Sequence, residues 1–128
     1  MNKVIIEGRL GKTPEIVTFK DGNKQARFSV ATNESWMDKK SGERVTKTEW
    51  HTVVVRGNNV NTVEKYIQKG TSVLIDGKLQ HRSYDKDGVT HYVTEIVTNF
   101  VKQLSNFGLT DQAIIDMAQP QEDYSAPF

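Results

Sequence analysis

The sequence has 128 residues, of which 36% are hydrophobic and 26% charged, and this size and composition fit one water-soluble domain but are small for two. It contains no cysteine, which excludes disulfides, thiolate metal sites and a cysteine nucleophile, and no apolar run approaches the roughly 20 residues of a membrane helix. The formal net charge is +1, but residues 1–105 carry all 17 Lys and Arg with 12 of the 16 acids, a net +5, whereas residues 106–128 carry only the other four acids.

The first elements that we expect are strands, because apolar and polar residues alternate and β-branched residues are frequent. One long strand runs from about residue 3 to residue 19, with a bend or bulge at 11–14, where Gly and Pro interrupt the alternation. A turn at Asp21-Gly22-Asn23 leads into a second strand, which begins near Ala26 and ends near Asn33.

A polar loop is expected next, from Ser35 to Arg44, with Trp36 inside it. The third strand then spans about 45–56. Alternation places Trp50 on one of its faces and His51 on the other. Both faces are partly apolar, so we expect one of them to meet a partner.

An amphipathic helix is predicted at 60–67, where apolar residues are spaced three and four apart. Asn59 is the expected N-cap, and Gly70 follows the helix end. The fourth strand runs from about 71 to 84, and an Asp-Gly turn leads into the fifth, at 89–101.

Three strands, a helix and two strands predict an all-β fold, namely a five-stranded OB-fold barrel with its one helix between strands 3 and 4. We expect this domain to occupy residues 1–105 and a short acidic C-terminal tail to occupy 106–128. Within the tail, Leu109 to Met117 carries apolar residues on one helical stripe, which predicts a short helix.

Residue patterns that support catalysis are missing from the sequence, which has no phosphate loop, no nucleophile elbow and no His pair at metal-ligand spacing. His51, His81 and His91 are scattered, and Asp85 and Asp87 belong to a turn. We therefore expect a protein that is not an enzyme and that needs no metal or cofactor.

Aromatic and basic residues occur together on expected surface elements: Trp36 with Lys39, Trp50 with Lys47 and Arg56, and Tyr84 with Arg82. Such rings stack on any base for about 1–3 kcal/mol each, while Lys and Arg hold the phosphate backbone without reading sequence. The pattern indicates single-stranded nucleic acid as the partner. The alternative is that Trp50 and Tyr84 are core residues of the sheet.

Five groups of residues follow one another at informative spacing: Asn2 to Gly11 with Pro14-Glu15, Ala31 to Trp36, Thr48 to His51, Tyr66 to Gly70, and Ile75 to Leu79. With them the chain resembles the bacterial single-stranded DNA-binding protein family over residues 1 to about 102. The resemblance implies an OB-fold that assembles as a homotetramer and wraps single-stranded DNA around itself. It also implies a cytoplasmic, nucleoid-associated protein of DNA replication, recombination and repair, with no membrane partner.

The resemblance further implies roles for single residues. The positions that match base-stacking aromatics are Trp36, Trp50 and Tyr84. The basic positions on the DNA path are Lys3, Lys69 and Arg82, to which the aromatic and basic pattern adds Lys39 and Lys47. Arg56 stands where the family often has Phe, and its guanidinium can stack and contact a phosphate. His51 matches a histidine at the subunit interface.

The C-terminus matches the family in part. Pro127 and Phe128 are present, but the acidic run is reduced to Glu122 and Asp123, and residues 124–126 separate it from the end. We expect Asp123, Pro127 and Phe128 to form a tip that recruits replication and repair proteins, because an aromatic ring with a terminal carboxylate suits a basic pocket.

Two other classes of function fit an OB-fold. One is a protein-interaction module of a primosome or similar assembly, whose DNA contacts are incidental; Trp36, Trp50 and Phe128 argue against it. The other is an OB-fold nuclease or other enzyme, for which the sequence lacks a credible set of acid, base and metal ligands.

Overall fold

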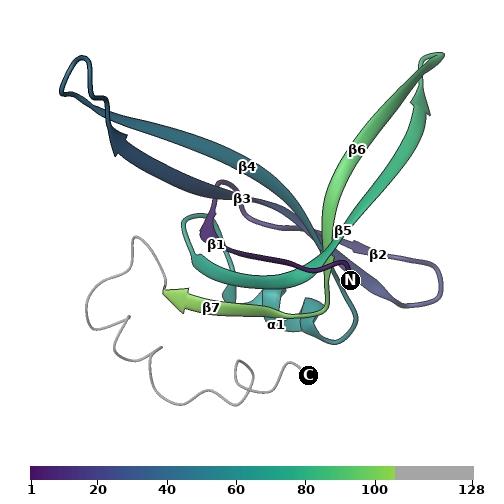
Figure 1. Ribbon diagram of the computed structural model, residues 1–128. Coiled ribbons are helices and arrows are strands. Elements are labelled where there is room, and N and C mark those ends of the chain that lie inside the picture. Colours follow the sequence, from purple (N-terminus) through teal and green to yellow (C-terminus); the bar gives the residue numbers. More distant parts are fainter. Residues whose placement is uncertain (106–128) are drawn as a thin grey trace.

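A computed structural model describes residues 1–105 as strands and one helix (Figure 1). The elements are β1 (Val4–Leu10), β2 (Glu15–Thr18), β3 (Lys24–Met37), β4 (Arg44–Arg56), α1 (Asn59–Tyr66), β5 (Ser72–Lys86), β6 (Val89–Thr98) and β7 (Val101–Ser105). In this part of the chain no helix has the length and apolar character needed to cross a membrane. The predicted tail helix and C-terminal tip lie outside the described residues.

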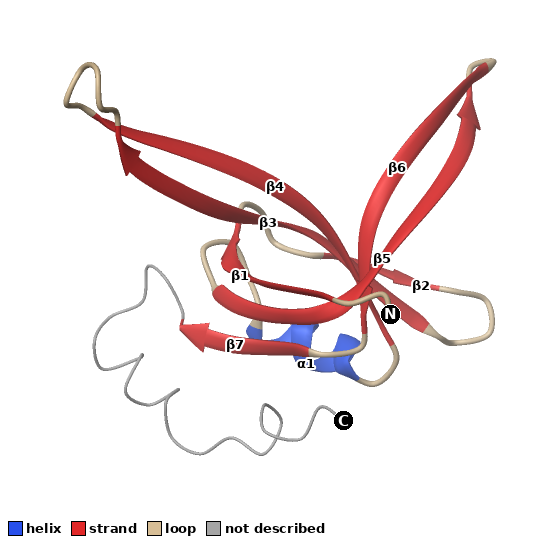
Figure 2. Cartoon of the chain, in the orientation of Figure 1, coloured by secondary structure: helices blue, strands red, loops and turns tan. Residues whose placement is uncertain are grey.

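Five strands close into a barrel, because β1 pairs with β3 on one side and with β5 on the other. The order around the barrel is β1, β3, β4, β6 and β5. β4 and β6 run parallel, joined from Val53↔Ile96 to Val55↔Thr98, and the remaining pairs in the ring are antiparallel. α1 covers one end of the barrel (Figure 2). The predicted all-β OB barrel, with its helix between the third and fourth barrel strands, is confirmed.

The barrel interior is filled by the residues whose alternation turns them inward. The buried apolar residues of the core cluster include Ala26, Phe28 and Val30 of β3, Val53 and Val55 of β4, and Val73 and Ile75 of β5. α1 adds Val60 and Val63, and Ile67 follows at its C-cap. The apolar residues whose spacing of three and four predicts the helix are therefore the residues that α1 and its C-cap bury against the barrel.

The first barrel strand is bent, as predicted. β1 pairs with β3 at Leu10↔Val30, and β2 resumes the pairing at Glu15↔Arg27 after the interruption at 11–14. Gly8 lies where the strands approach closely, since a Cβ there would be 2.1 Å from the Ala31 carbonyl oxygen. A larger residue at this position would force the backbones apart.

The predicted polar loop from Ser35 is wrong at its start. β3 continues through Trp36 to Met37, which pairs with Arg44, so Trp36 lies on a strand. The loop is only 38–43, and Asp38 closes it by accepting hydrogen bonds from the Lys40 N–H and the Ser41 hydroxyl. Polar residues misled the prediction because both faces of this part of the β3–β4 hairpin are exposed to solvent.

Two other predicted boundaries differ. The N-cap position is Asn58 and not Asn59, and its side chain makes no capping hydrogen bond. The fifth strand is interrupted after Thr98, whose hydroxyl accepts a hydrogen bond from Phe100 N–H at 2.8 Å. The chain changes direction there, and β7 pairs with the first part of β5, at Ile75↔Val101, instead of extending β6.

Two long hairpins project from the barrel. The outer parts of β3–β4 and of β5–β6 leave the barrel as separate ribbons that diverge from their junction (Figure 1). They separate beyond the Val53↔Ile96 pair, where the described pairing of β4 with β6 begins. We call these ribbons the β3–β4 arm and the β5–β6 arm. They carry most of the aromatic residues that the sequence singles out.

Candidate nucleic-acid interface

Both tryptophans are exposed on the β3–β4 arm. The exposed fraction is 47% for Trp36 and 59% for Trp50. Tyr84, on the β5–β6 arm, is 42% exposed. The alternative interpretation of Trp50 and Tyr84 as core residues is therefore wrong, because the hydrophobic core is complete without them.

The two indoles lie on opposite faces of the β3–β4 arm. Pairing of β3 with β4 runs without interruption from Gln25↔Arg56 to Met37↔Arg44, so side chains alternate strictly along both strands. Trp36 belongs to the row that begins with the buried Val30, whereas Trp50 neighbours Ala31 on the other side. The arm therefore offers one indole on each face.

Gly11 supports the ring of Trp50. A Cβ at Gly11 would lie 2.5 Å from the Cζ3 atom of the indole, so the ring packs directly on the glycine backbone. Gly11 belongs to the bend between β1 and β2, which also carries Lys12. The bend between β1 and β2 thus supports the Trp50 ring.

On the β5–β6 arm an aromatic cluster forms around Tyr84. Its ring stacks on His91 with a centroid separation of 5.1 Å and an interplanar angle of 17°. The Arg82 guanidinium lies 5.8 Å from the centre of the tyrosine ring. His91 was not predicted from the sequence. The signal was available, because residues at equal distances from the Asp-Gly turn of a hairpin lie opposite each other, and Tyr84 and His91 are such a pair. The cluster thus combines a stacked pair of rings with a cation over the tyrosine ring.

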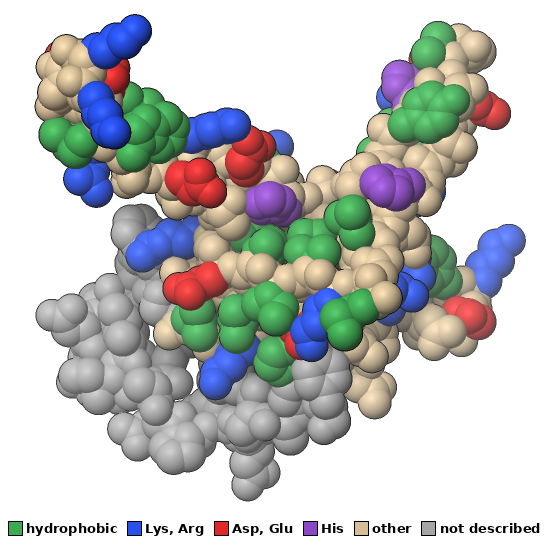
Figure 3. All heavy atoms as spheres, viewed as in Figure 1, with side chains coloured by type: hydrophobic (Ala, Val, Ile, Leu, Met, Phe, Trp, Pro, Cys, Tyr) green, Lys and Arg blue, Asp and Glu red, His purple; other side chains and the backbone are tan. Residues whose placement is uncertain are grey.

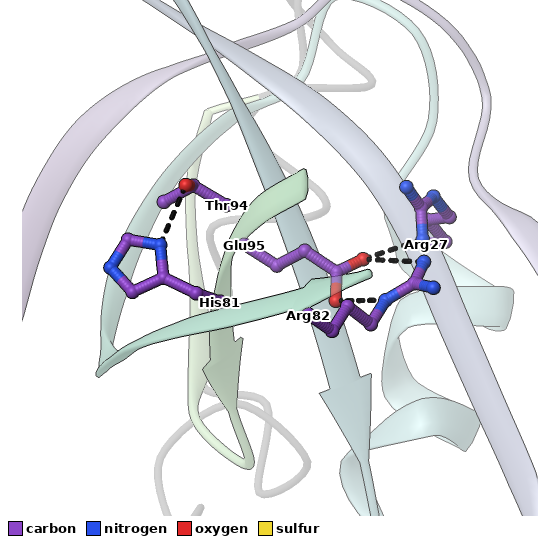
Figure 4. Close-up of polar contacts among 5 residues, drawn as sticks. All are labelled: Arg27, His81, Arg82, Thr94 and Glu95. Atoms are coloured by element: carbon purple, nitrogen blue, oxygen red, sulfur yellow. Dashed lines mark hydrogen bonds and ion pairs between the residues drawn. The ribbon is translucent and has the colours of Figure 1, made fainter. Parts of the chain in front are cut away.

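A buried carboxylate, that of Glu95, joins Arg27 and Arg82 (Figure 4). Glu95 of β6 is only 2% exposed. It accepts a hydrogen bond from Arg27 Nη1 at 2.6 Å and two from Arg82, from Nε at 2.8 Å and from Nη2 at 3.2 Å. Hydrogen bonding from Arg82 is the largest of the effects that lower the pKa of Glu95, and the bond to Glu95 raises the pKa of Arg82.

This arginine pair was not predicted as a unit. Arg82 was predicted from the family resemblance, but Arg27 and Glu95 were not singled out. The available signal was one acidic residue within the apolar β6 sequence around Ile96. A buried acid requires cationic partners, although the sequence does not say which cations supply them.

The other predicted cations are dispersed. Lys3 pairs with Asp76 at 3.3 Å and Lys47 pairs with Glu49 at 3.2 Å. Lys39 is exposed in the loop at the tip of the β3–β4 arm, and Lys69 is exposed in the connection between α1 and β5. Figure 3 shows Lys and Arg side chains interspersed with Asp and Glu over the arms and the barrel. The structure does not gather these four lysines into one patch.

Arg56 lies between two cavities. It lines a cavity of 590 Å³ together with Lys24 and Phe19, and a second cavity of 570 Å³ together with Lys3 and Lys78. The side chain is on the same face of β4 as Trp50, because the two residues are an even number of positions apart. Arg56 can therefore contact a phosphate on the face that presents Trp50.

His51 is half-buried, and its Nε2 lies 2.8 Å from the Thr32 hydroxyl. This hydrogen bond gives the ring a structural role within the chain. Among residues 1–105, no three His, Asp or Glu side chains are placed to hold a metal ion. The chemistry that these residues offer is stacking and charge neutralisation.

Comparison with known proteins agrees with this geometry. The model of the single-strand binding protein family matches residues 1–104. A solved structure of the Plasmodium falciparum SSB in complex with ssDNA has 37% sequence identity and a TM-score of 0.69, over 77% of this chain and 86% of that one. A deletion mutant of the single-stranded DNA-binding protein from Thermus aquaticus has 22% identity and a TM-score of 0.71, over 84% of this chain and 52% of that one. This second match shows that the two proteins share a fold. The chain belongs to the single-strand binding protein family.

Proposed function

We propose that this protein binds single-stranded DNA without sequence preference and protects it during replication, recombination and repair. The observation that carries the proposal is the exposure of both indoles on a projecting arm. The Plasmodium falciparum relative, which was solved with ssDNA, supports the same partner. Stacking on Trp36, Trp50 and Tyr84 tolerates any base, since every base has a π-face.

The cations predicted on the DNA path complete the proposed interface. Arg82 stands beside Tyr84, and Arg56 takes part through its guanidinium. The lysines of the proposed path are Lys3, Lys39, Lys47 and Lys69. Because these lysines are dispersed and two of them are paired with acids, we expect them to contribute less than the stacked rings.

Titration of tryptophan emission with oligo-dT at two salt concentrations tests this function. We expect stoichiometric quenching and an affinity that falls as salt rises, because bound phosphates release counterions. A protein-interaction module with incidental DNA contacts would show no saturable quenching.

We also propose that the chain assembles as a homotetramer. Family membership supports this assembly, and so do apolar side chains that the single chain leaves exposed, such as Ile5 at 59%. His51 is the proposed interface residue. Sedimentation equilibrium gives the mass of the assembly, and a smaller mass for His51→Ala is the expected effect. A monomeric wild-type protein would refute the assembly.

For the segment beyond the OB domain we propose recruitment of replication and repair proteins through Asp123, Pro127 and Phe128. The terminal Pro-Phe pair and the four acids at 106–128 support this proposal. A peptide with the last residues of the chain should compete with the full chain for a captured replication protein. Equal capture in the presence of excess peptide would contradict the recruiting role.

A further inference from the structure

A small polar cavity lies beside Trp50. It has a volume of 280 Å³ and is lined by Lys12, Thr13, Glu15, Arg27, Ser29 and Thr52, with Phe28. We call it the Arg27 cavity. Thr52 is two residues from Trp50 on β4, so both side chains lie on the same face. On the other side, Lys12 follows Gly11, on which the indole packs.

The lining suits a phosphate better than a base. Two cationic residues and three that carry hydroxyl groups line the cavity, against one acidic residue, Glu15. Arg, Lys, Ser and Thr side chains are the groups with which proteins contact nucleic-acid phosphates.

Arg27 is fixed before any ligand arrives. Its Nη1 donates to the buried Glu95 at 2.6 Å, and the other oxygen of that carboxylate is bound by Arg82. The Arg27 side chain remains 34% exposed, and its guanidinium has further N–H groups for a second acceptor. A guanidinium held in one orientation loses less side-chain entropy on binding than a free lysine does.

From these contacts we infer that the Arg27 cavity binds one phosphate of a single strand whose base stacks on Trp50, and that Glu95 positions Arg27 for this contact. The inference rests on the proposed function and adds a subsite to it. Glu95 is here a positioning residue, because it acts through Arg27. Its negative charge is paired with two arginines, which weakens its repulsion of the strand while the carboxylate orients Arg27.

The experiment measures oligo-dT affinity over a series of salt concentrations for Arg27→Gln, Glu95→Gln and a control, Lys65→Gln. Lys65 lies on α1, at the end of the barrel away from the arms. Lys65→Gln removes one positive charge, as Arg27→Gln does. We expect Arg27→Gln and Glu95→Gln each to bind about tenfold more weakly. Each slope of log affinity against log salt should decrease by about 0.7, the value for one lost single-strand phosphate contact.

The Glu95→Gln variant distinguishes the positioning of Arg27 from the effect of the Glu95 charge itself. Removal of a negative charge near DNA should by itself tighten binding, whereas loss of positioning weakens it. Tighter or unchanged binding by Glu95→Gln overturns the positioning role, and an Arg27→Gln slope equal to that of Lys65→Gln overturns the site. Failure of the wild-type protein to bind oligo-dT would instead refute the proposed function.

Arg27→Lys keeps the proposal testable if Glu95→Gln does not fold. Lysine preserves the charge but cannot hold the carboxylate and a phosphate in the planar geometry of a guanidinium. We expect weaker binding than wild type although the net charge is the same. Wild-type affinity and slope for Arg27→Lys would show that a fixed guanidinium is not needed.

Discussion

At the scale of single residues, we propose that Trp36 and Trp50 act as two separate stacking sites. Strict alternation along β3 and β4 puts them on opposite faces of the same arm. Trp50 is also supported by Gly11, and at Trp36 the cross-strand neighbour is Val45. Residues without shared partners are expected to act independently.

Replacement of each tryptophan by alanine should therefore weaken oligo-dT binding by about 1–3 kcal/mol, the value of one lost stack. In the double variant the two losses should add within about 0.5 kcal/mol. Fluorescence anisotropy of a labelled oligonucleotide gives the affinities without relying on the substituted indoles. Unchanged affinity in both single variants would mean that these rings are not the stacking surface.

Glu95 makes the stability of the barrel depend on pH. Its pKa is lowered from 4.5 in the folded state, mainly by the hydrogen bond from Arg82, so its contribution to stability is present above pH 4.5 and is lost as the pH falls through the folded-state value. Urea unfolding should show wild type more stable than Glu95→Gln at pH 7, with a difference that shrinks below pH 4.5. A constant difference over this range would contradict the lowered pKa.

At the scale of elements, the order of strands and helix could be predicted because alternation and the spacing of three and four reflect which faces are buried. The full length of β3 could not be predicted. Its residues 35–37 are exposed on both faces, and they are a strand only because β4 pairs with them. The Arg27–Glu95–Arg82 group was missed for a related reason. Its members come from three strands, and sequence spacing does not report contacts that form only when the barrel closes.

α1 should contribute to stability but not directly to DNA binding. Val63 is fully buried against the barrel core, so Val63→Ala should lower the free energy of unfolding by about 2 kcal/mol through lost burial and the cavity left behind. Urea unfolding measures this loss. Oligo-dT affinity of the folded variant should equal that of wild type, and a parallel loss of affinity would indicate that α1 itself takes part in DNA binding.

At the scale of the whole molecule, the opposite charges of the two segments are the main feature. Residues 1–105 carry a net charge of +5 and residues 106–128 a net charge of −4. We propose that the first segment is the complete DNA-binding and oligomerisation domain. The acidic segment would then compete weakly with DNA for the basic surface.

Removal of residues 106–128 should leave a folded protein whose oligo-dT affinity is equal to that of the full chain or slightly higher. The gain should be larger at low salt, because screening weakens the competition. Affinity measured at two salt concentrations tests both points. A marked loss of affinity would place part of the DNA contact in the acidic segment.

The placement of one indole on each side of a two-stranded arm also sets a geometric requirement on the nucleic acid. A chain of nucleotides that contacts both rings of one protein chain has to cross the edge of the arm, so its backbone must curve sharply there. A stiff duplex cannot follow that route. Where one strand contacts both rings, this curvature therefore favours single-stranded over paired DNA.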